Sequence, residues 1–222
     1  MDFMRFFQSL EELFYEVIVW LVFYPRTFWI TLRHPQRMMD HADTELGDVQ
    51  SEQYTDTLSP PLFLIISMII SFVITLSIDS RIANPPQAKV FDTTEQLLIF
   101  RTFSFSLLPL LMSLQLLRKL ELTLDRDELR PLFYSQCYVT APFAMIVGPT
   151  LDISSRCEVN SLPIVLAPLF GILFWYLRQQ AHWFSNKVGF GLWRGWLYSL
   201  STWLVGIVGI VMLSVIWTHI RH

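Results

Sequence analysis

Five long apolar runs between Leu58 and Trp217, each bounded by charged residues, constrain this chain more than any motif in it. A helix rises about 1.5 Å per residue, so about 20 residues cross the roughly 30 Å hydrocarbon core of a bilayer. The sequence therefore predicts an all-α, polytopic membrane helix bundle of five transmembrane helices. The predicted spans are Leu58–Ile78, Leu97–Leu117, Leu132–Leu151, Leu162–Leu177 and Trp196–Trp217.

The composition agrees with a membrane location. Hydrophobic residues make up 53% of the 222 residues and charged residues only 16%, whereas a soluble domain carries about 25% charged residues. This apolar surplus exceeds what one protein core can bury, so lipid must cover the rest. No secretory peptide fits the start of the chain, because Glu11, Glu12 and Glu16 interrupt the apolar stretch that such a peptide needs.

The distribution of Lys and Arg predicts the topology, since cationic loops stay in the cytoplasm. Segments 1–57, 118–131 and 178–195 carry 11 of these residues, and the opposite connections with the C-terminal tail carry four. We therefore expect a multi-pass protein of the cytoplasmic (inner) membrane with a cytoplasmic N-terminus and an external C-terminus. An endomembrane protein would share the pattern. The net charge of −3 provides no basic field for nucleic acid.

The N-terminal segment has an amphipathic pattern. Polar residues from Arg5 to Glu16 share one face of a helix over residues 2–24, and Pro25 is expected to end it. We expect residues 1–36 to form an interfacial helix and anchor on the cytoplasmic leaflet. A second hypothesis stays open, in which residues 13–32 span or re-enter the membrane and the first dozen residues lie outside.

An acidic stretch follows the N-terminal segment. It carries six carboxylates and no Lys or Arg between Asp40 and Asp56, so residues 37–57 are predicted to be a solvated cytoplasmic linker. An acidic handle for a basic cytosolic partner is the alternative. The five-span domain then covers residues 58–217, and residues 218–222 form an external tail.

Arg101 is the single cation inside a predicted span. A charge at mid-bilayer costs up to about 3 kcal/mol, although near a span end the side chain can reach water. Ser104 and Gln115 share its helical face, and Asp79 and Asp152 are predicted to lie at a similar depth. The two hypotheses are a structural ion pair and a contact with a substrate or lipid phosphate through Arg101, Ser104, Gln115 and Asp152.

Small residues recur on one face of the last span and its approach. Since packing drives helix association in lipid, such a face predicts a tight helix contact, either within the bundle, which we favour, or with another subunit. This set, called the small-residue seam below, comprises Gly191, Gly195, Ser199, Thr202, Gly206 and Gly209.

The chain carries no signature of a catalytic or cofactor site. No His pair lies within a span, and neither a Gly-x-Ser-x-Gly elbow nor a phosphate-binding glycine loop occurs. Cys137 and Cys157 would lie about 30 Å apart on the predicted helix, which excludes a disulfide, and they lack zinc-ligand spacing. We therefore expect no catalytic residue, no metal and no cofactor.

The five-span architecture and the sequence "CYVTAP" resemble the YIP (Ypt-interacting protein) family and its bacterial permease-like relatives. In that family the third span carries a Tyr followed four residues later by Pro, as Tyr138 and Pro142 do here. Cys137 stands where the family usually has Gly. The resemblance covers about residues 54–217 and implies a non-enzymatic protein that binds other membrane proteins or shapes membranes.

Two functions from different classes follow from these patterns. The first is a non-catalytic accessory or scaffold subunit that binds membrane lipids and other membrane proteins or itself. The second is a small permease or lipid translocase for an anionic substrate. It is expected to act as an oligomer, because a single charged residue within the spans provides too few groups for coupled transport.

Overall fold

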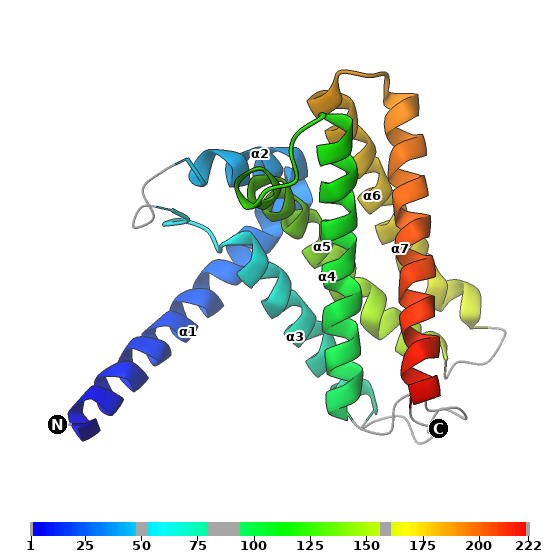
Figure 1. The fold of residues 1–222 in the computed structure, drawn as a ribbon. Coiled ribbons are helices and arrows are strands. Elements are labelled where there is room, and N and C mark those ends of the chain that lie inside the picture. The colour runs from blue at the N-terminus through cyan, green and yellow to red at the C-terminus, as the bar shows by residue number, and fades with distance from the viewer. Residues whose placement is uncertain (1, 48–52, 80–93, 156–160, 221–222) are drawn as a thin grey trace.

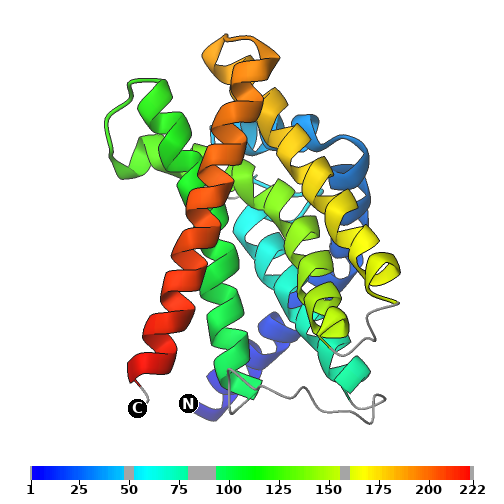
Figure 2. The same ribbon diagram turned by 90° about the vertical axis from the view of Figure 1, so that its right-hand side faces the viewer.

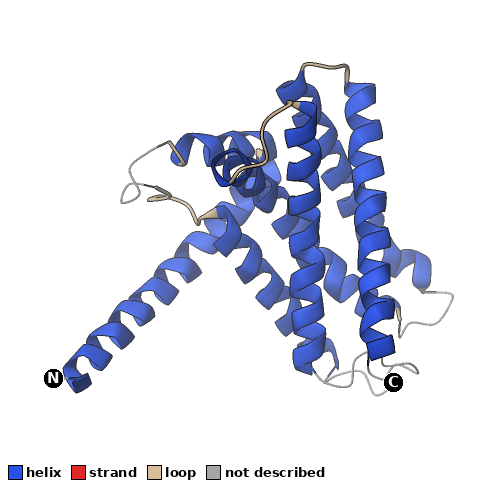
Figure 3. Cartoon of the chain, viewed as in Figure 1, coloured by secondary structure: helices blue, strands red, loops and turns tan. Residues whose placement is uncertain are grey.

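The computed structural model describes residues 2–47, 53–79, 94–155 and 161–220, and these fold into seven helices without any strand (Figure 3). The all-α fold class is confirmed. The helices are α1 (Asp2–Arg33), α2 (Pro35–Glu45), α3 (Pro60–Asp79), α4 (Thr94–Lys119), α5 (Arg126–Ser154), α6 (Leu162–Val188) and α7 (Leu192–Ile220).

Helices α3 to α7 form the bundle, α2 lies across one end of it, and α1 slants away from it (Figures 1 and 2). We call the end that carries α2 the α2 end. At the opposite end, the tail end, α1, α4 and α6 begin, and α3, α5 and α7 end. The chain thus runs from one end of the bundle to the other in α1 and in each of α3 to α7.

Five helices in the described ranges are long and apolar enough to cross a membrane, so the predicted number is confirmed. The set differs from the prediction at two places, because α1 qualifies and α5 does not. The reason is composition: four of the first five residues of α5 are charged, and polar groups recur along its length. These polar groups face other helices, and 15 residues of α5 are buried.

Helix α5 is the centre of the bundle. Two clusters of buried hydrophobic residues meet on it, one shared mainly with α4 and α6 and the other with α2 and α3. Val139 and Phe143 belong to the first cluster, and Tyr138 and Ala141 to the second. Opposite faces of one helix therefore hold the two halves of the core together.

The prediction that Pro25 ends the first helix is wrong, because α1 continues to Arg33. Proline removes one backbone hydrogen bond and usually kinks or stops a helix. Here contacts on both sides of Pro25 hold the chain: the Tyr24 hydroxyl lies 3.0 Å from the Ser67 hydroxyl, and Thr27 Oγ1 donates to Phe23 O at 2.9 Å. Thr27 Oγ1 also accepts from the Leu58 N–H at 3.2 Å. The last third of α1 is thereby fixed to the bundle.

The prediction of a solvated acidic linker over residues 37–57 is wrong for its first part, which belongs to α2. Met38, Met39 and Ala42 are buried on one face of this helix and belong to the core clusters that centre on α5. The methionines precede the acidic stretch, and they supply the apolar face that the stretch itself lacks. The part of the linker at 48–52 lies outside the described residues.

Candidate functional site

A polar cluster near the tail end joins three helices through Arg101 of α4, Asp152 of α5 and Thr75 of α3. Arg101 Nη2 forms an ion pair with Asp152 Oδ2, and Arg101 Nη1 donates to Thr75 Oγ1 at 3.1 Å. The Thr75 hydroxyl in turn donates to Asp152 Oδ2 at 2.8 Å. The predicted pairing of Arg101 with Asp152 is confirmed. Asp79, the other predicted partner, ends α3, and its side chain lies outside the described part.

The charged side chains of this cluster are largely buried, so breaking the ion pair would destabilise the fold. The side chains of Arg101 and Asp152 are only 13% and 21% exposed, and Thr75 is buried. Removing either charge would leave the other one largely out of water without a partner, which is costly. The donors of Arg101 are directed at Asp152 and Thr75, so an outside anion would compete with a carboxylate already in place. The arrangement clamps α3, α4 and α5 together.

Gly148 lets α5 approach this cluster closely. A side-chain carbon at this position would lie 2.5 Å from Ser71 Oγ of α3 and 3.6 Å from Arg101 Nη1. Ser71 Oγ also donates to Ala144 O of α5 at 3.3 Å. The missing side chain therefore provides room for both the α3–α5 contact and the guanidinium group.

The predicted stripe of Arg101, Ser104 and Gln115 does not form one site. Ser104 is buried, and its hydroxyl has no hydrogen-bond partner among the described residues. Gln115 lies about 20 Å further along α4, in a groove of about 410 Å³ at the α2 end that also contacts Arg118 and Thr202. The assignment of Gln115 to the Arg101 site is wrong. The two residues share a face of α4, but about four turns of helix separate them, so they lie near opposite ends of the bundle.

Five of the six residues of the small-residue seam lie on α7 and face the inside of the bundle. Ser199 and Thr202 are buried, and a side-chain carbon on Gly195 would collide with the carbonyl oxygen of Ala181 in α6. The same carbon on Gly206 would lie 3.0 Å from Leu108 of α4, and on Gly209 it would lie 3.3 Å from Leu107. Gly191 does not belong to this contact, since it precedes α7 and no atom lies within 4 Å of its side-chain position.

An ionic network at the α2 end fixes α2 to the bundle, and the sequence did not predict it. Lys187 Nζ of α6 lies 2.6 Å from Asp43 Oδ2 and 3.8 Å from Asp40 Oδ1. The Ser135 hydroxyl of α5 donates to Asp43 Oδ1 at 2.9 Å. The predicted acidic handle is thus partly engaged within the chain. The sequence offered one indication of this network. No Lys or Arg lies between Asp40 and Asp56, so any cation that pairs with these carboxylates must come from another segment.

Tyr54 follows α2 and has a buried hydroxyl with no partner among the described residues. Burial raises the pKa of Tyr54 far above its usual range, and the negative charges of Glu45 and Asp43 act in the same direction. The Tyr54 N–H donates to a Glu45 carboxylate oxygen. Tyr54 is therefore a neutral group held against Glu45 at the end of α2.

A pair of buried amides links α5 to α6. Gln136 and Gln180 are completely buried, and Gln180 Nε2 donates to Gln136 Oε1. The remaining oxygen of Gln180 and nitrogen of Gln136 have no partner among the described residues. The sequence does not predict this pair, because its members come from separate apolar runs that only the three-dimensional packing brings together.

Tyr138 and Pro142, on which the predicted resemblance to the YIP family rests, lie in the centre of α5. Tyr138 is fully buried, and its hydroxyl donates to Leu58 O, just before α3, at 2.8 Å. Pro142 is buried one turn later. Cys137 is a free, buried thiol, and Cys157 lies outside the described residues. The motif therefore positions α3 against α5.

No set of three or more His, Cys, Asp or Glu residues in the described ranges is arranged to hold a metal ion. No protein-family model matches this chain, and no curated protein or solved structure is significantly similar to it. The resemblance to the YIP family therefore stays a prediction that rests on Tyr138, Pro142 and the span pattern.

Proposed function

We propose that this multi-pass membrane protein is a non-catalytic accessory or scaffold subunit that binds other membrane proteins or lipids. The observation that carries the proposal is α1, an apolar helix that leaves the bundle (Figure 1). Its apolar span covers Phe7–Arg33, and only 6% of the residues in its most apolar window are buried, against 33% in α3. A helix with this much free surface is suited to contact a second membrane protein.

Large apolar side chains are exposed along one side of α1. Leu10, Leu13, Phe14 and Leu21 are 50–75% exposed. Successive positions of a helix are rotated by about 100°, so these four residues lie within about 100° of one another and form one apolar face. Lipid or a partner helix must cover this surface, because exposing so much apolar area to water is energetically unfavourable.

The length of α1 supports a helix that crosses the membrane. Its 32 residues extend about 48 Å, which exceeds the roughly 30 Å hydrocarbon core. Glu12 and Arg33 lie about 32 Å apart along the helix and can then reach the two membrane surfaces. Glu16 and Arg26 lie between them, and their side chains must extend toward the nearer surface. The hypothesis that residues 13–32 span the membrane gains support over the interfacial helix.

We place the α2 end in the cytoplasm of a cell with a cytoplasmic (inner) membrane, because 118–131, 178–195 and most basic residues of 1–57 belong to that end. If α1 crosses the membrane, the chain starts and finishes on the external side. If α1 lies on the surface, the N-terminus is cytoplasmic, as the sequence first suggested.

Copurification tests the scaffold proposal. We expect the full-length protein, extracted in mild detergent through a tag at its C-terminus, to retain a second membrane protein. Replacing Leu10, Leu13 and Leu21 of α1 with Ala should release that protein. The matched control replaces Leu197, Leu200 and Leu204 of α7, which are 41–51% exposed, and should retain it.

Two results would overturn the scaffold proposal. One is recovery of the wild-type chain alone under conditions that keep known membrane complexes intact. The other is equal retention of the same protein by the α1 and α7 variants, because the contact would then not involve α1.

The alternative function is a small permease or lipid translocase for an anionic substrate, acting as an oligomer. It would use Arg101 to bind the substrate within the membrane. The ion pair with Asp152 gives this function less support than the scaffold, since the guanidinium group is already neutralised. Flux in liposomes that stays unchanged in Arg101→Ala would remove Arg101 from such a mechanism.

A further inference from the structure

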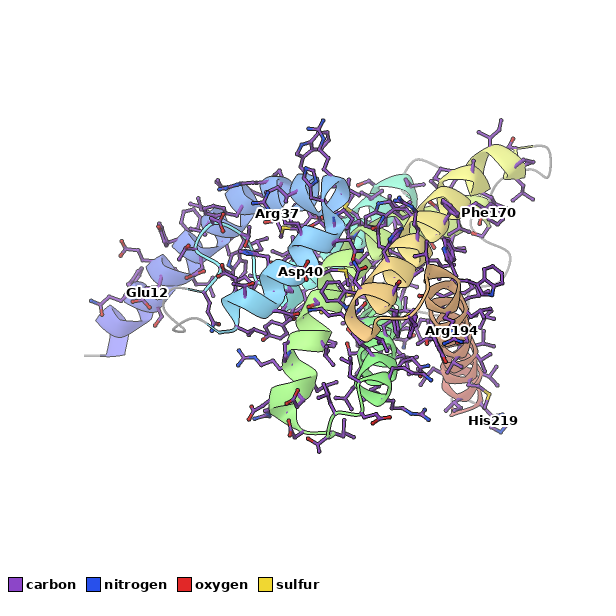
Figure 4. All side chains as sticks on the ribbon, turned by 90° about the horizontal axis from the view of Figure 1, so that it is seen from above. Glu12, Arg37, Asp40, Phe170, Arg194 and His219 are labelled. Atoms are coloured by element: carbon purple, nitrogen blue, oxygen red, sulfur yellow. The ribbon has the colours of Figure 1, made fainter. Side chains whose placement is uncertain are left out.

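A basic pocket of about 490 Å³ opens at the α2 end where α1 meets α2 and α6. Figure 4 looks down on this end and shows Arg37 at the start of α2. The side chains around it come from the consecutive helices α1 and α2 and from α6, which is distant from them in the sequence. They include Arg33, His34, Arg37, Arg178 and His182.

The charge of this pocket is unbalanced. No carboxylate lines it, and none of its three arginines has an ion pair within the described ranges. Arg33 makes a cation–π contact, in which its guanidinium carbon lies 5.3 Å from the centre of the Trp29 ring. Lys187, on the same end of the molecule, is by contrast paired with Asp43. The pocket therefore has a positive potential that an anion would neutralise.

The start of α2 adds donors to the same pocket. Pro35, Gln36 and Arg37 line it, and His34, which precedes them, makes no side-chain capping bond. The first N–H groups of a helix have no acceptor within the helix, and they attract anions. Gln36 Nε2 donates to Gln179 O at 2.9 Å, which fixes the start of α2 against α6. The arginines and the helix start converge on one space.

The side of the pocket toward the middle of the bundle is apolar. Leu32 and Trp175 belong to its lining. Trp29 lies one turn before Arg33 and is 60% exposed. Gly171 lies one turn before Trp175, with no atom within 4 Å of its side-chain position. A ligand with a charged head and an apolar tail fits this arrangement better than a free ion.

We propose that this pocket binds the phosphate-bearing headgroup of an anionic phospholipid, with an acyl chain running past Trp29 and Gly171. Arginine is suited to this role because its planar guanidinium donates two parallel hydrogen bonds to phosphate oxygens. The inference deepens the lipid-binding part of the proposed function. It does not depend on a partner protein for α1.

The positive-inside pattern alone does not account for the pocket. Topology requires cations on one side of the membrane, but they can stand anywhere in the loops. Here three of them line one concave space that lacks acidic residues and continues into an apolar surface. Arg118, Arg126 and Arg194 satisfy the topological rule equally well at other places on the α2 end. Figure 4 shows Arg194 at the start of α7, away from Arg37.

Native mass spectrometry of the purified full-length protein tests the proposal. The protein in neutral detergent is titrated with phosphatidylglycerol, with phosphatidylcholine and with inorganic phosphate. We expect a retained phosphatidylglycerol adduct and at least tenfold weaker retention of phosphatidylcholine. Arg33→Gln, Arg37→Gln and Arg178→Gln should each weaken retention about fivefold, and the triple variant about a hundredfold.

The controls separate this site from general charge effects. The triple variant of Arg118, Arg126 and Arg194 to Gln has the same net charge and should retain the lipid as the wild type does. If the first triple variant does not fold, Arg178→Gln alone decides, because an unchanged affinity would contradict the proposal. Equal retention of both lipids, or equal loss in both triple variants, would also overturn it.

The inorganic phosphate arm distinguishes a lipid from a free anion. We expect phosphate to displace phosphatidylglycerol only at a concentration at least a hundredfold above that of the lipid. Displacement at equal concentration would assign the pocket to a free anion and overturn the lipid assignment. The protein is purified alone for this experiment, so failure of the lipid site and failure of the α1 scaffold proposal are distinguishable.

Discussion

Helices α1 and α5 show opposite relations between composition and burial. Helix α1 is apolar enough to span a membrane, yet only 6% of its most apolar window is buried. Helix α5 does not pass that criterion, yet 15 of its residues are buried. In a soluble protein the apolar helix would be the buried one. Here lipid can cover apolar side chains, whereas polar side chains need other helices.

The polar groups of α5 each reach a different neighbour. Tyr138 reaches the start of α3, Ser135 reaches α2, Gln136 reaches α6, and Asp152 reaches α4. Helix α1 makes comparable contacts in its last third, where Tyr24 and Thr27 reach Ser67 and the Leu58 N–H. The two helices therefore differ in role: α5 holds the bundle together, and α1 extends from it. Matched substitutions in α5 and α1 test this difference.

The largest effect is expected at Asp152. Asp152→Ala leaves Arg101 without its carboxylate, and we expect the free energy of unfolding to fall by about 3 kcal/mol. Unfolding by detergent titration measures it. Glu12→Ala in α1 removes the same kind of charge from an exposed position and should change the value by less than about 0.5 kcal/mol. An equal loss in both variants would contradict the contrast.

The buried amide pair should give the next effect. Gln136→Leu removes the acceptor of the Gln180 amide, and an unpaired buried donor costs about 1–3 kcal/mol. We expect about 2 kcal/mol in the same titration. Gln8→Leu in α1, which is exposed, is the control and should be neutral. Replacing both Gln136 and Gln180 with Leu should recover part of the loss, and a further additive loss would argue against a direct pair.

A smaller effect is expected for one hydroxyl group. Tyr138→Phe removes the hydrogen bond to Leu58 O, and we expect a loss of about 1 kcal/mol. Tyr15 of α1 is 67% exposed, so Tyr15→Phe should leave stability unchanged. Thermal unfolding of the two variants in one detergent compares them directly. A larger loss for Tyr15→Phe would show that α1 is buried against something in the purified protein.

The smallest effect on stability is expected for the exposed leucines of α1. Leu13→Ala combined with Leu21→Ala should change the free energy of unfolding by less than about 0.5 kcal/mol, because neither side chain packs against the bundle. A loss above about 2 kcal/mol would show that the chain buries α1 itself, through a second copy or another arrangement.

The sequence predicted much of the fold and part of the site. Apolar runs and their lengths predict the helices, and the single intramembrane cation led to Asp152 because both were placed near one membrane surface. The spacing of Gly195, Gly206 and Gly209 predicted close packing. These predictions succeeded because each depends on a pattern within a single helix.

The missed features all depend on contacts between distant segments. Pro25 fails to end α1 because Ser67 and Leu58 hold its flanks. The acidic stretch folds because Met38 and Met39 meet α5. The lining of the basic pocket comes from α1, α2 and α6. The number of cations in each loop predicted the topology, but it could not predict that Arg33, Arg37 and Arg178 line one pocket.

The sidedness of single cysteines tests the central proposal that α1 crosses the membrane as an arm of the bundle rather than lying on its surface. In a Cys157→Ser background the buried Cys137 is inert, and Gln8→Cys, Thr44→Cys and His219→Cys place one exposed thiol each at the start of α1, on α2 and near the end of α7. An impermeant maleimide applied to sealed vesicles of either orientation should label positions 8 and 219 from one side and position 44 from the other. Labelling of position 8 together with position 44 would contradict the account.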